Sequence, residues 1–170
     1  MTEKTRLNPI RTAPGPWSDE DIRRMPTQGF QKVLAIELDE VSPERITAHI
    51  DIDDRHINSG GAVHGGILMS FADSLGAIGA LQNLGPTQRT ATLESKTNFV
   101  RACTGAKITA ECRPLHVGHQ TSVWHTVVRD DGGRICAHVW QTQIHFDAKA
   151  SSNRDQGKRN AVPVSGSESG

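Results

Sequence analysis

The feature that most constrains the fold of this chain is a single long helical pattern over residues 64 to 84, set among segments with strand-like patterns. Large apolar residues recur in it at three- and four-residue spacing and form one face that must pack on a sheet. They are Ile67, Phe71, Leu75, Ile78 and Leu81. The pattern ends before Gly85 and Pro86, which is typical of a helix terminus. We therefore expect one central helix covered by a sheet.

Strand-like alternation of apolar and polar residues appears twice before the helix and four times after it. The segments are residues 32–41, 45–53, 91–100, 106–117, 121–130 and 134–146. The residues SPE separate the first two segments, and DGG forms a hairpin turn between the last two. This order predicts an α+β fold with one long helix and a six-stranded antiparallel sheet, in which the last four strands form a meander.

The two ends of the chain differ from this central part in composition. Residues 1–28 are polar and proline-rich, with a short helix that Ser18 and Asp21 could cap, and they predict an N-terminal arm lying on the domain. Residues 148–170 are rich in Ser, Gly and charge and predict a disordered polar tail. The folded domain is expected over residues 29–147.

Composition excludes several classes of function. The formal net charge is zero and no basic stripe occurs, which argues against a nucleic-acid partner. No run of eighteen apolar residues and no signal-peptide pattern occur, so we expect neither a membrane span nor export. The three cysteines, Cys103, Cys112 and Cys136, form no CxxC pair, which fits a reduced, cytoplasmic protein.

Asp73 is the one acid inside the helical pattern. It lies in a stripe of small residues that would allow another helix to approach closely, namely Gly66, Ser70, Gly76, Ala77 and Ala80. A carboxylate on a face that should pack is costly unless it is paired, hydrogen-bonded or used in chemistry. Two interpretations stay open: Asp73 is satisfied by Ser or Thr hydroxyls at a helix interface, or it is catalytic.

The helix is preceded by the glycine-rich run SGGAVHGG, which has neither the ending of a P-loop nor the GxGxxG spacing. Free backbone N–H groups near Gly65 and Gly66 could hold a carbonyl oxygen that becomes negative, unless the glycines merely turn the chain. Asp73 follows Gly65 by eight residues, which is about 12 Å along a helix. One helix cannot bring both groups to one carbonyl, so a symmetric dimer with two shared sites is expected.

Asn58, the HGG of His64 to Gly66 and the pair Ala72–Asp73 resemble the hotdog-fold acyl-CoA thioesterases of the phenylacetate-degradation type. Residues 98–124 are also similar to the proofreading thioesterases of enterobactin and menaquinone biosynthesis. The resemblance covers residues 30–146 and implies a hotdog fold, in which the sheet wraps the long helix. It implies a homodimer paired edge to edge, commonly a dimer of dimers, that hydrolyses acyl-CoA without a cofactor or metal.

The resemblance also implies roles for single residues. Asp73 would attack the thioester or activate water, and Gly65 would donate its N–H to the thioester oxygen. Asn58 would orient water or the thioester, and Thr92 would position the water. His64 would contact the thioester or only fix the loop. The proofreading relatives carry Glu in place of Asp73, and the shorter Asp favours water activation without deciding between nucleophile and base.

Coenzyme A needs cations or N–H groups for its phosphates. By the same resemblance, Gly66, Arg101 and the loop 117–120 (Val117, Gly118, His119 and Gln120) would bind the substrate. Arg101 has an alternative interpretation as an ordinary solvated strand end. The HxxH pair of His116 and His119 has no third ligand nearby, so no metal site is predicted.

The resulting hypothesis is an acyl-CoA thioesterase for an aromatic or medium-sized acyl group. Two alternatives stay open. One is a hotdog acyl-CoA hydratase or dehydratase, and the other is a non-catalytic acyl-CoA-binding module.

Overall fold

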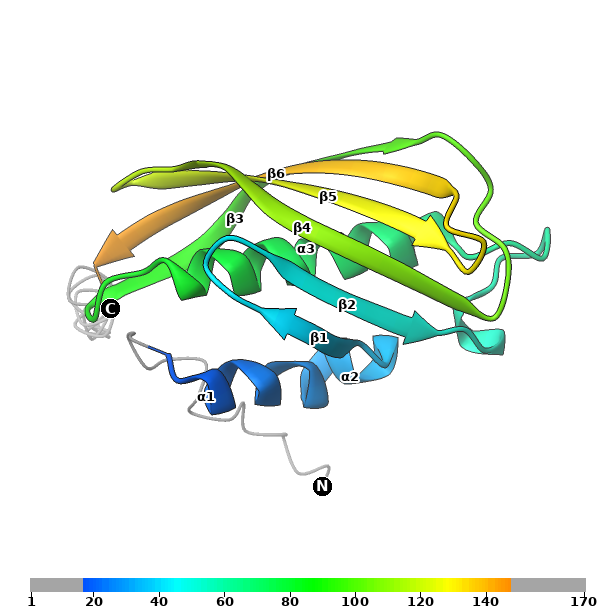
Figure 1. Ribbon diagram of the computed structural model, residues 1–170, viewed down its shortest axis with the longest axis horizontal. Coiled ribbons are helices and arrows are strands. Elements are labelled where there is room, and N and C mark those ends of the chain that lie inside the picture. The colour runs from blue at the N-terminus through cyan, green and yellow to red at the C-terminus, as the bar shows by residue number, and fades with distance from the viewer. Residues whose placement is uncertain (1–16, 148–170) are drawn as a thin grey trace, which may run out of the picture.

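The computed structural model describes residues 17–147, which form one antiparallel sheet with a long helix packed on one of its faces (Figure 1). The strands are β1 (Glu37–Val41), β2 (Ile46–Asp51), β3 (Gln88–Phe99), β4 (Lys107–Val117), β5 (Thr121–Asp130) and β6 (Ile135–Asp147). The long helix is α3 (Gly65–Gln82). The predicted α+β architecture, with one long helix and a six-stranded antiparallel sheet, is confirmed. Residues 1–16 of the predicted arm and the predicted tail, 148–170, lie outside the described residues.

The strand order is β1-β2-β4-β5-β6-β3, so the predicted meander of the last four strands is wrong. Of the last four strands, only β4, β5 and β6 follow one another as neighbours, joined by tight turns. Strand β3 pairs with β6 instead of β4, and β4 pairs with β2. The reason is that residues 100–106 carry the chain from the edge strand β3 past β6 and β5 to β4. Alternation within a strand does not report which neighbour that strand takes.

The first predicted strand also begins too early. Residues 32–34 belong to the short helix α2 (Gly29–Leu34), which ends at Ala35 in a left-handed conformation, with φ of 55°. Leu34 and Ile36 are both buried, so a short apolar pattern fits helix and strand equally well. The predicted cap is confirmed in α1 (Asp19–Arg24), where Ser18 Oγ accepts a hydrogen bond from Asp21 N–H at 3.1 Å.

Helix α3 buries its apolar face on the sheet as predicted, with Phe71, Leu75 and Ile78 at the centre of the core. At Gly76 the stripe of small residues is used differently from the prediction. A Cβ atom on Gly76 would lie 1.9 Å from Gln141 Oε1 of strand β6. A sheet side chain, and not a second helix, therefore occupies the space that Gly76 leaves.

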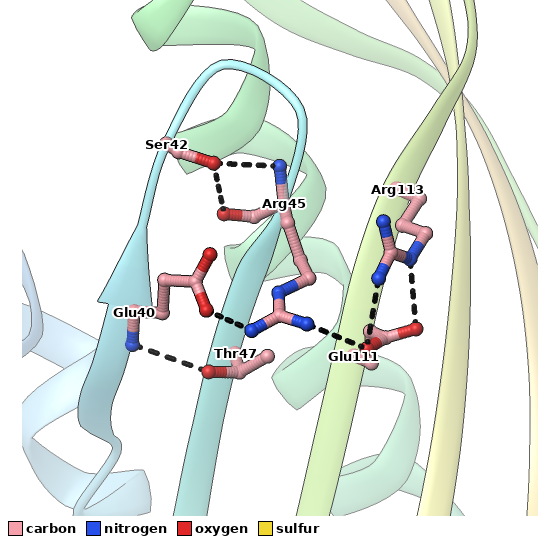
Figure 2. Close-up of polar contacts among 6 residues, drawn as sticks. All are labelled: Glu40, Ser42, Arg45, Thr47, Glu111 and Arg113. Atoms are coloured by element: carbon pink, nitrogen blue, oxygen red, sulfur yellow. Dashed lines mark hydrogen bonds and ion pairs between the residues drawn. The ribbon is translucent and has the colours of Figure 1, made fainter.

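Over strands β1, β2 and β4 the opposite face of the sheet is polar. Figure 2 shows Arg45, the residue before β2, between Glu40 of β1 and Glu111 of β4, with Arg45 Nη1 3.8 Å from Glu111 Oε2. Arg113 also donates to Glu111, with 2.8 Å between Nε and Oε1. These cations lower the pKa of Glu111, and hydrogen bonding to Arg113 is the largest cause. The sheet therefore has one core-facing side, which is the side that α3 covers.

Strand β3 forms one edge of the sheet, and none of its twelve residues is fully buried. Leu93 is 63% exposed and Phe99 52% exposed. A long edge strand with exposed apolar side chains is a surface on which another strand can pair. None of the helices within residues 17–147 has the length and hydropathy needed to span a membrane.

Candidate active site

The structure places Asp73 midway along α3, facing the inner side of strands β3 and β6. Thr92 Oγ1 of β3 lies 3.1 Å from Asp73 Oδ1, and Gln141 Nε2 of β6 lies 2.7 Å from the same oxygen. Both groups donate to the carboxylate. No hydrogen bond from the described residues reaches Asp73 Oδ2. One carboxylate oxygen is therefore held by the protein, and the other is left available to a ligand.

Two glutamines behind Asp73 are absent from the residues that the sequence singled out. Gln141 and Gln143 are both buried, and the amide of Gln143 donates to Thr92 Oγ1 at 2.9 Å. Their signal in the sequence is alternation: they continue the inward-facing side of β6 that begins with Ala137 and Val139. Polar residues at core positions of a strand mark a hydrogen-bonded site, because an unpaired buried amide is costly.

A cleft of about 370 Å³ opens beside Asp73. Its walls come from α2, α3 and β3, and they are Phe30, Gln31, Met69, Ser70, Ser74 and Ser95. Phe30 is 63% exposed and Met69 41% exposed. The cleft thus combines a carboxylate with an exposed aromatic ring and a flexible apolar side chain, which suits an apolar group attached to a reacting centre.

The start of α3 carries one unoccupied amide. His64 is the N-cap, and its Nδ1 accepts a hydrogen bond from Gly66 N–H at 2.9 Å. Gly66 N–H is therefore already used within the chain. Gly65 N–H has no acceptor among the described residues, and a helix N-terminus concentrates partial positive charge at such a group. His64 acts structurally here as a cap, and any contact with a substrate stays a prediction.

Asn58 organises the turn before α3. Its Oδ1 accepts hydrogen bonds from Gly60 N–H at 2.8 Å and from Ala62 N–H at 3.3 Å. Asn58 and Gly65 line a second cleft of about 390 Å³, together with Phe99 and Arg101 near the end of β3. The structure thus brings together Asn58, Gly65 and Arg101, but in a different cleft from Asp73, which Thr92 contacts.

The loop at residues 117–120 lies far from Arg101 in the same chain. His119 O accepts a hydrogen bond from Gln88 Nε2 at 3.4 Å, and Gln88 begins β3 whereas Arg101 follows its end. The twelve residues of β3 span about 40 Å. One chain therefore does not assemble Val117, Gly118, His119, Gln120 and Arg101 into one binding surface.

His145 of β6 packs under that loop and is 7% exposed. Its Nε2 lies 2.9 Å from Ser122 Oγ, and its backbone N–H donates to Gln120 O at 2.7 Å. Burial lowers the pKa of His145 below its ordinary value, which favours the neutral ring. The base of the loop is thus held by a buried histidine.

One group of possible metal-ligating atoms occurs within the described residues. Glu37, His49 and Asp51 place one such atom each within 4.8 Å of one another on β1 and β2. Asp51 is paired with Lys107 Nζ at 3.3 Å, and both acids are exposed. His116, which lies on β4 and not in a loop, and His119 are not part of this group, and neither is Asp73.

Comparison with known proteins adds the family context. The family model described as the thioesterase superfamily matches residues 60–137. The chain is 28% identical to the 1,4-dihydroxy-2-naphthoyl-CoA hydrolase of Escherichia coli, over 61% of this chain and 76% of that one. It is 32% identical to the proofreading thioesterase EntH of Klebsiella pneumoniae, over 54% of this chain and 66% of that one. The crystal structure of thioesterase HI1161 from Haemophilus influenzae has the same fold, with a TM-score of 0.72, 20% identity and coverage of 81% and 96%.

Proposed function

From the premise that this chain belongs to the thioesterase superfamily of hotdog enzymes, we propose that it hydrolyses an acyl-CoA to the free acid and coenzyme A at a site shared by two subunits. The observation that carries the shared site is the separation of Asp73 from Gly65. They lie on one helix but line different clefts. A complete site needs the carboxylate and the amide at one thioester.

Edge strand β3 suggests how two chains would complete the site. Thr92 contacts Asp73 from the first half of β3, and the ring of Phe99, the last residue of β3, lies against Gly65. If two β3 strands pair antiparallel about an axis between Ser95 and Lys96, Thr92 comes opposite the partner subunit's Phe99. The acid of one chain would then face the amide of the other, and the two-fold axis would generate two equal sites.

The same pairing would join the two predicted parts of the coenzyme site. The loop 117–120 lies beside the start of β3, and Arg101 follows its end. In an antiparallel pair, the start of one β3 lies beside the end of the other. Arg101 and the partner's loop would then share one edge, where a cation and backbone N–H groups could hold the phosphates of coenzyme A.

The chemistry follows from the polar contacts. Asp73 Oδ2 takes a proton from a water molecule, whose oxygen attacks the thioester carbon. Gly65 N–H of the other chain donates to the oxygen that becomes negative. Collapse of the tetrahedral intermediate breaks the C–S bond, and the proton on Asp73 passes to the departing thiolate. In the alternative route Asp73 attacks directly and forms an anhydride, which water then cleaves.

Single-turnover hydrolysis in oxygen-18 water separates these routes. Water activation puts the label into the released acid only. An anhydride that water opens at the aspartyl carbon puts label into Asp73, which mass spectrometry of the protein detects. The shorter reach of Asp compared with Glu favours the first outcome.

The cleft beside Asp73 supports an aromatic or medium-sized acyl group. A volume of about 370 Å³ with Phe30 and Met69 in its wall provides apolar surface for such a group. The three cysteines, Cys103, Cys112 and Cys136, are unpaired and buried, which supports a reducing compartment, and we propose the cytoplasm. The resemblance to related thioesterases further suggests a dimer of dimers.

A mixed-dimer experiment tests the shared site. Gly65→Pro removes the N–H, and His64 already has the extended conformation, with ψ of 135°, that a following proline requires. Gly65→Ala is the matched control, since it keeps the N–H and adds the same Cβ beside Phe99. We expect Gly65→Pro to lose about 100- to 1000-fold in kcat, and Gly65→Ala to retain most of its activity.

Asp73→Asn should abolish hydrolysis and leave the fold intact. Coexpression of the Asp73→Asn and Gly65→Pro chains should restore about a quarter of wild-type activity, because half of the dimers are mixed and each has one intact site. No recovery in purified mixed dimers would exclude a shared site. Wild-type protein that binds acyl-CoA without releasing thiol would instead indicate a binding module, and conversion of an enoyl-CoA would indicate a hydratase.

A further inference from the structure

Gln141 has a contact pattern that simple core packing does not explain. It is 2% exposed, and its Nε2 lies 2.7 Å from Asp73 Oδ1, 3.2 Å from Asp73 O and 3.1 Å from Thr92 Oγ1. Two of these atoms are oxygens that can only accept hydrogen bonds. The amide must therefore present its NH₂ group to Asp73, since the reversed orientation would face oxygen against oxygen.

The other end of this amide is left without a partner. Gln141 Oε1 is buried and accepts no hydrogen bond from the described residues. It lies against Gly76, where a Cβ atom would come within 1.9 Å of it. A buried, unsatisfied amide oxygen costs free energy, and glycine inside a helix costs about 1 kcal/mol relative to alanine. An apolar side chain at position 141 would avoid both costs.

The donor and the acceptor of each hydrogen bond around Thr92 can be assigned. Thr90 Oγ1 donates to Gln143 Oε1 at 2.9 Å, and Gln143 Nε2 donates to Thr92 Oγ1 at 2.9 Å. Because Thr92 Oγ1 also accepts from Gln141, its single hydrogen points to Asp73 Oδ1. Two donors thus converge on Asp73 Oδ1, and Oδ2 is turned away from them.

We infer that Gln141 is a positioning residue for the proposed thioester hydrolysis: it fixes the carboxylate of Asp73 so that Oδ2 faces the cleft, and Gly76 is required for its fit. This inference rests on the proposed function. Gln141 contacts Asp73 and not the substrate, so its loss should slow the chemical step and leave substrate binding unchanged. A hydrogen bond to a charged group is worth roughly a 10- to 100-fold change in rate.

Gln141→Met tests this role, because methionine fills a similar volume and donates no hydrogen bond. We expect kcat for thiol release to fall roughly 10- to 100-fold with KM within about twofold of wild type. Thr126→Val is the control: Thr126 is a buried residue of β5, 2% exposed, whose hydroxyl bonds to Cys112 and not to Asp73. It should change thermal stability but not kcat.

Gly76→Ala gives a second test with Gln141 still present. The added Cβ should displace the amide and lower kcat by a similar factor. In a Gln141→Ala background the same substitution should change kcat by less than about twofold, since the opposing amide is gone. If Gln141→Met does not fold, this pair of Gly76 variants decides the question.

Full kcat in a folded Gln141→Met protein, or additive effects of Gly76→Ala and Gln141→Ala, would overturn the positioning role. These outcomes are distinguishable from failure of the proposed function. If the proposed function fails, the wild-type protein itself will release no thiol from any acyl-CoA, and Asp73→Asn will be indistinguishable from wild type.

Discussion

Thr92 and Asp73 come from different elements, an edge strand and the central helix, yet their side-chain oxygens lie 3.1 Å apart. The hydroxyl of Thr92 donates to the carboxylate oxygen that Gln141 also holds. The helix acid is therefore not an isolated charge in an apolar face. It is the end point of a hydrogen-bonded row that runs across the inner side of β3 and β6.

Thr92→Val should reduce kcat by roughly 10-fold, because the variant keeps the shape of the side chain but removes one hydrogen bond to a charged group. Thr92→Ser keeps the hydroxyl and should retain most of the activity. Steady-state thiol release measures both. If valine and serine reduce kcat equally, the hydroxyl has no role and only the branched shape matters.

Phe30→Ala should change which acyl groups are hydrolysed. Phe30 is exposed in the wall of the cleft beside Asp73, so its loss removes apolar contact from the acyl group but not from coenzyme A. We expect kcat/KM for benzoyl- and phenylacetyl-CoA to fall about 10-fold, on the scale of one lost apolar contact in a pocket. Acetyl-CoA should be affected much less.

Val33→Ala provides the comparison for Phe30, since Val33 lies on the same short helix, is 54% exposed and is outside the residues that line that cleft. Its acyl preference should equal that of wild type. If Phe30→Ala leaves the preference among acyl groups unchanged, then α2 does not contact the acyl group.

Arg101→Ala should raise KM for acyl-CoA by about 10-fold, through loss of a charge-assisted contact with phosphate. Arg101 is exposed and forms no ion pair with the described residues, so its guanidinium is available. Acyl-pantetheine, which lacks the nucleotide, is the control substrate and should show equal KM in both proteins. An unchanged KM for acyl-CoA would support the ordinary solvated strand end, and an equal loss for both substrates would exclude a contact with the nucleotide.

Gly79→Ala should destabilise the fold by about 1–3 kcal/mol through overpacking. A Cβ atom at this position would lie 2.5 Å from Cζ3 of the buried Trp124 ring. Urea unfolding gives the change in free energy. Trp124→Phe removes part of that ring, so the double variant should cost less than the sum of the single variants.

Acid should destabilise the protein through His145. Burial lowers the pKa of His145 in the folded state, so the unfolded chain binds the proton more readily. Stability is therefore lost as the pH falls through the unfolded value of 6.5 toward the lower folded value. His145→Gln should show a smaller difference in unfolding free energy between pH 8 and pH 5.5. An equal difference in both proteins would assign the acid effect to other groups.

Local sequence determined the elements of this protein. The spacing of Phe71, Leu75 and Ile78 predicts the buried face of one helix, and period-two alternation predicts strands such as β6. Both signals depend on neighbours within a few residues, so they can be read without the fold. The same is true of the cap formed by Ser18 and Asp21.

Only the tertiary structure decided which elements meet. The pairing of β3 with β6 brings Gln141 and Gln143 to Thr92, and the packing of α3 on that pair brings Asp73 to all three. The packing role of Gly76 likewise depends on Gln141, a residue 65 positions away in the sequence. These contacts depend on strand order and on helix-to-sheet distance, which residue patterns within single elements do not encode.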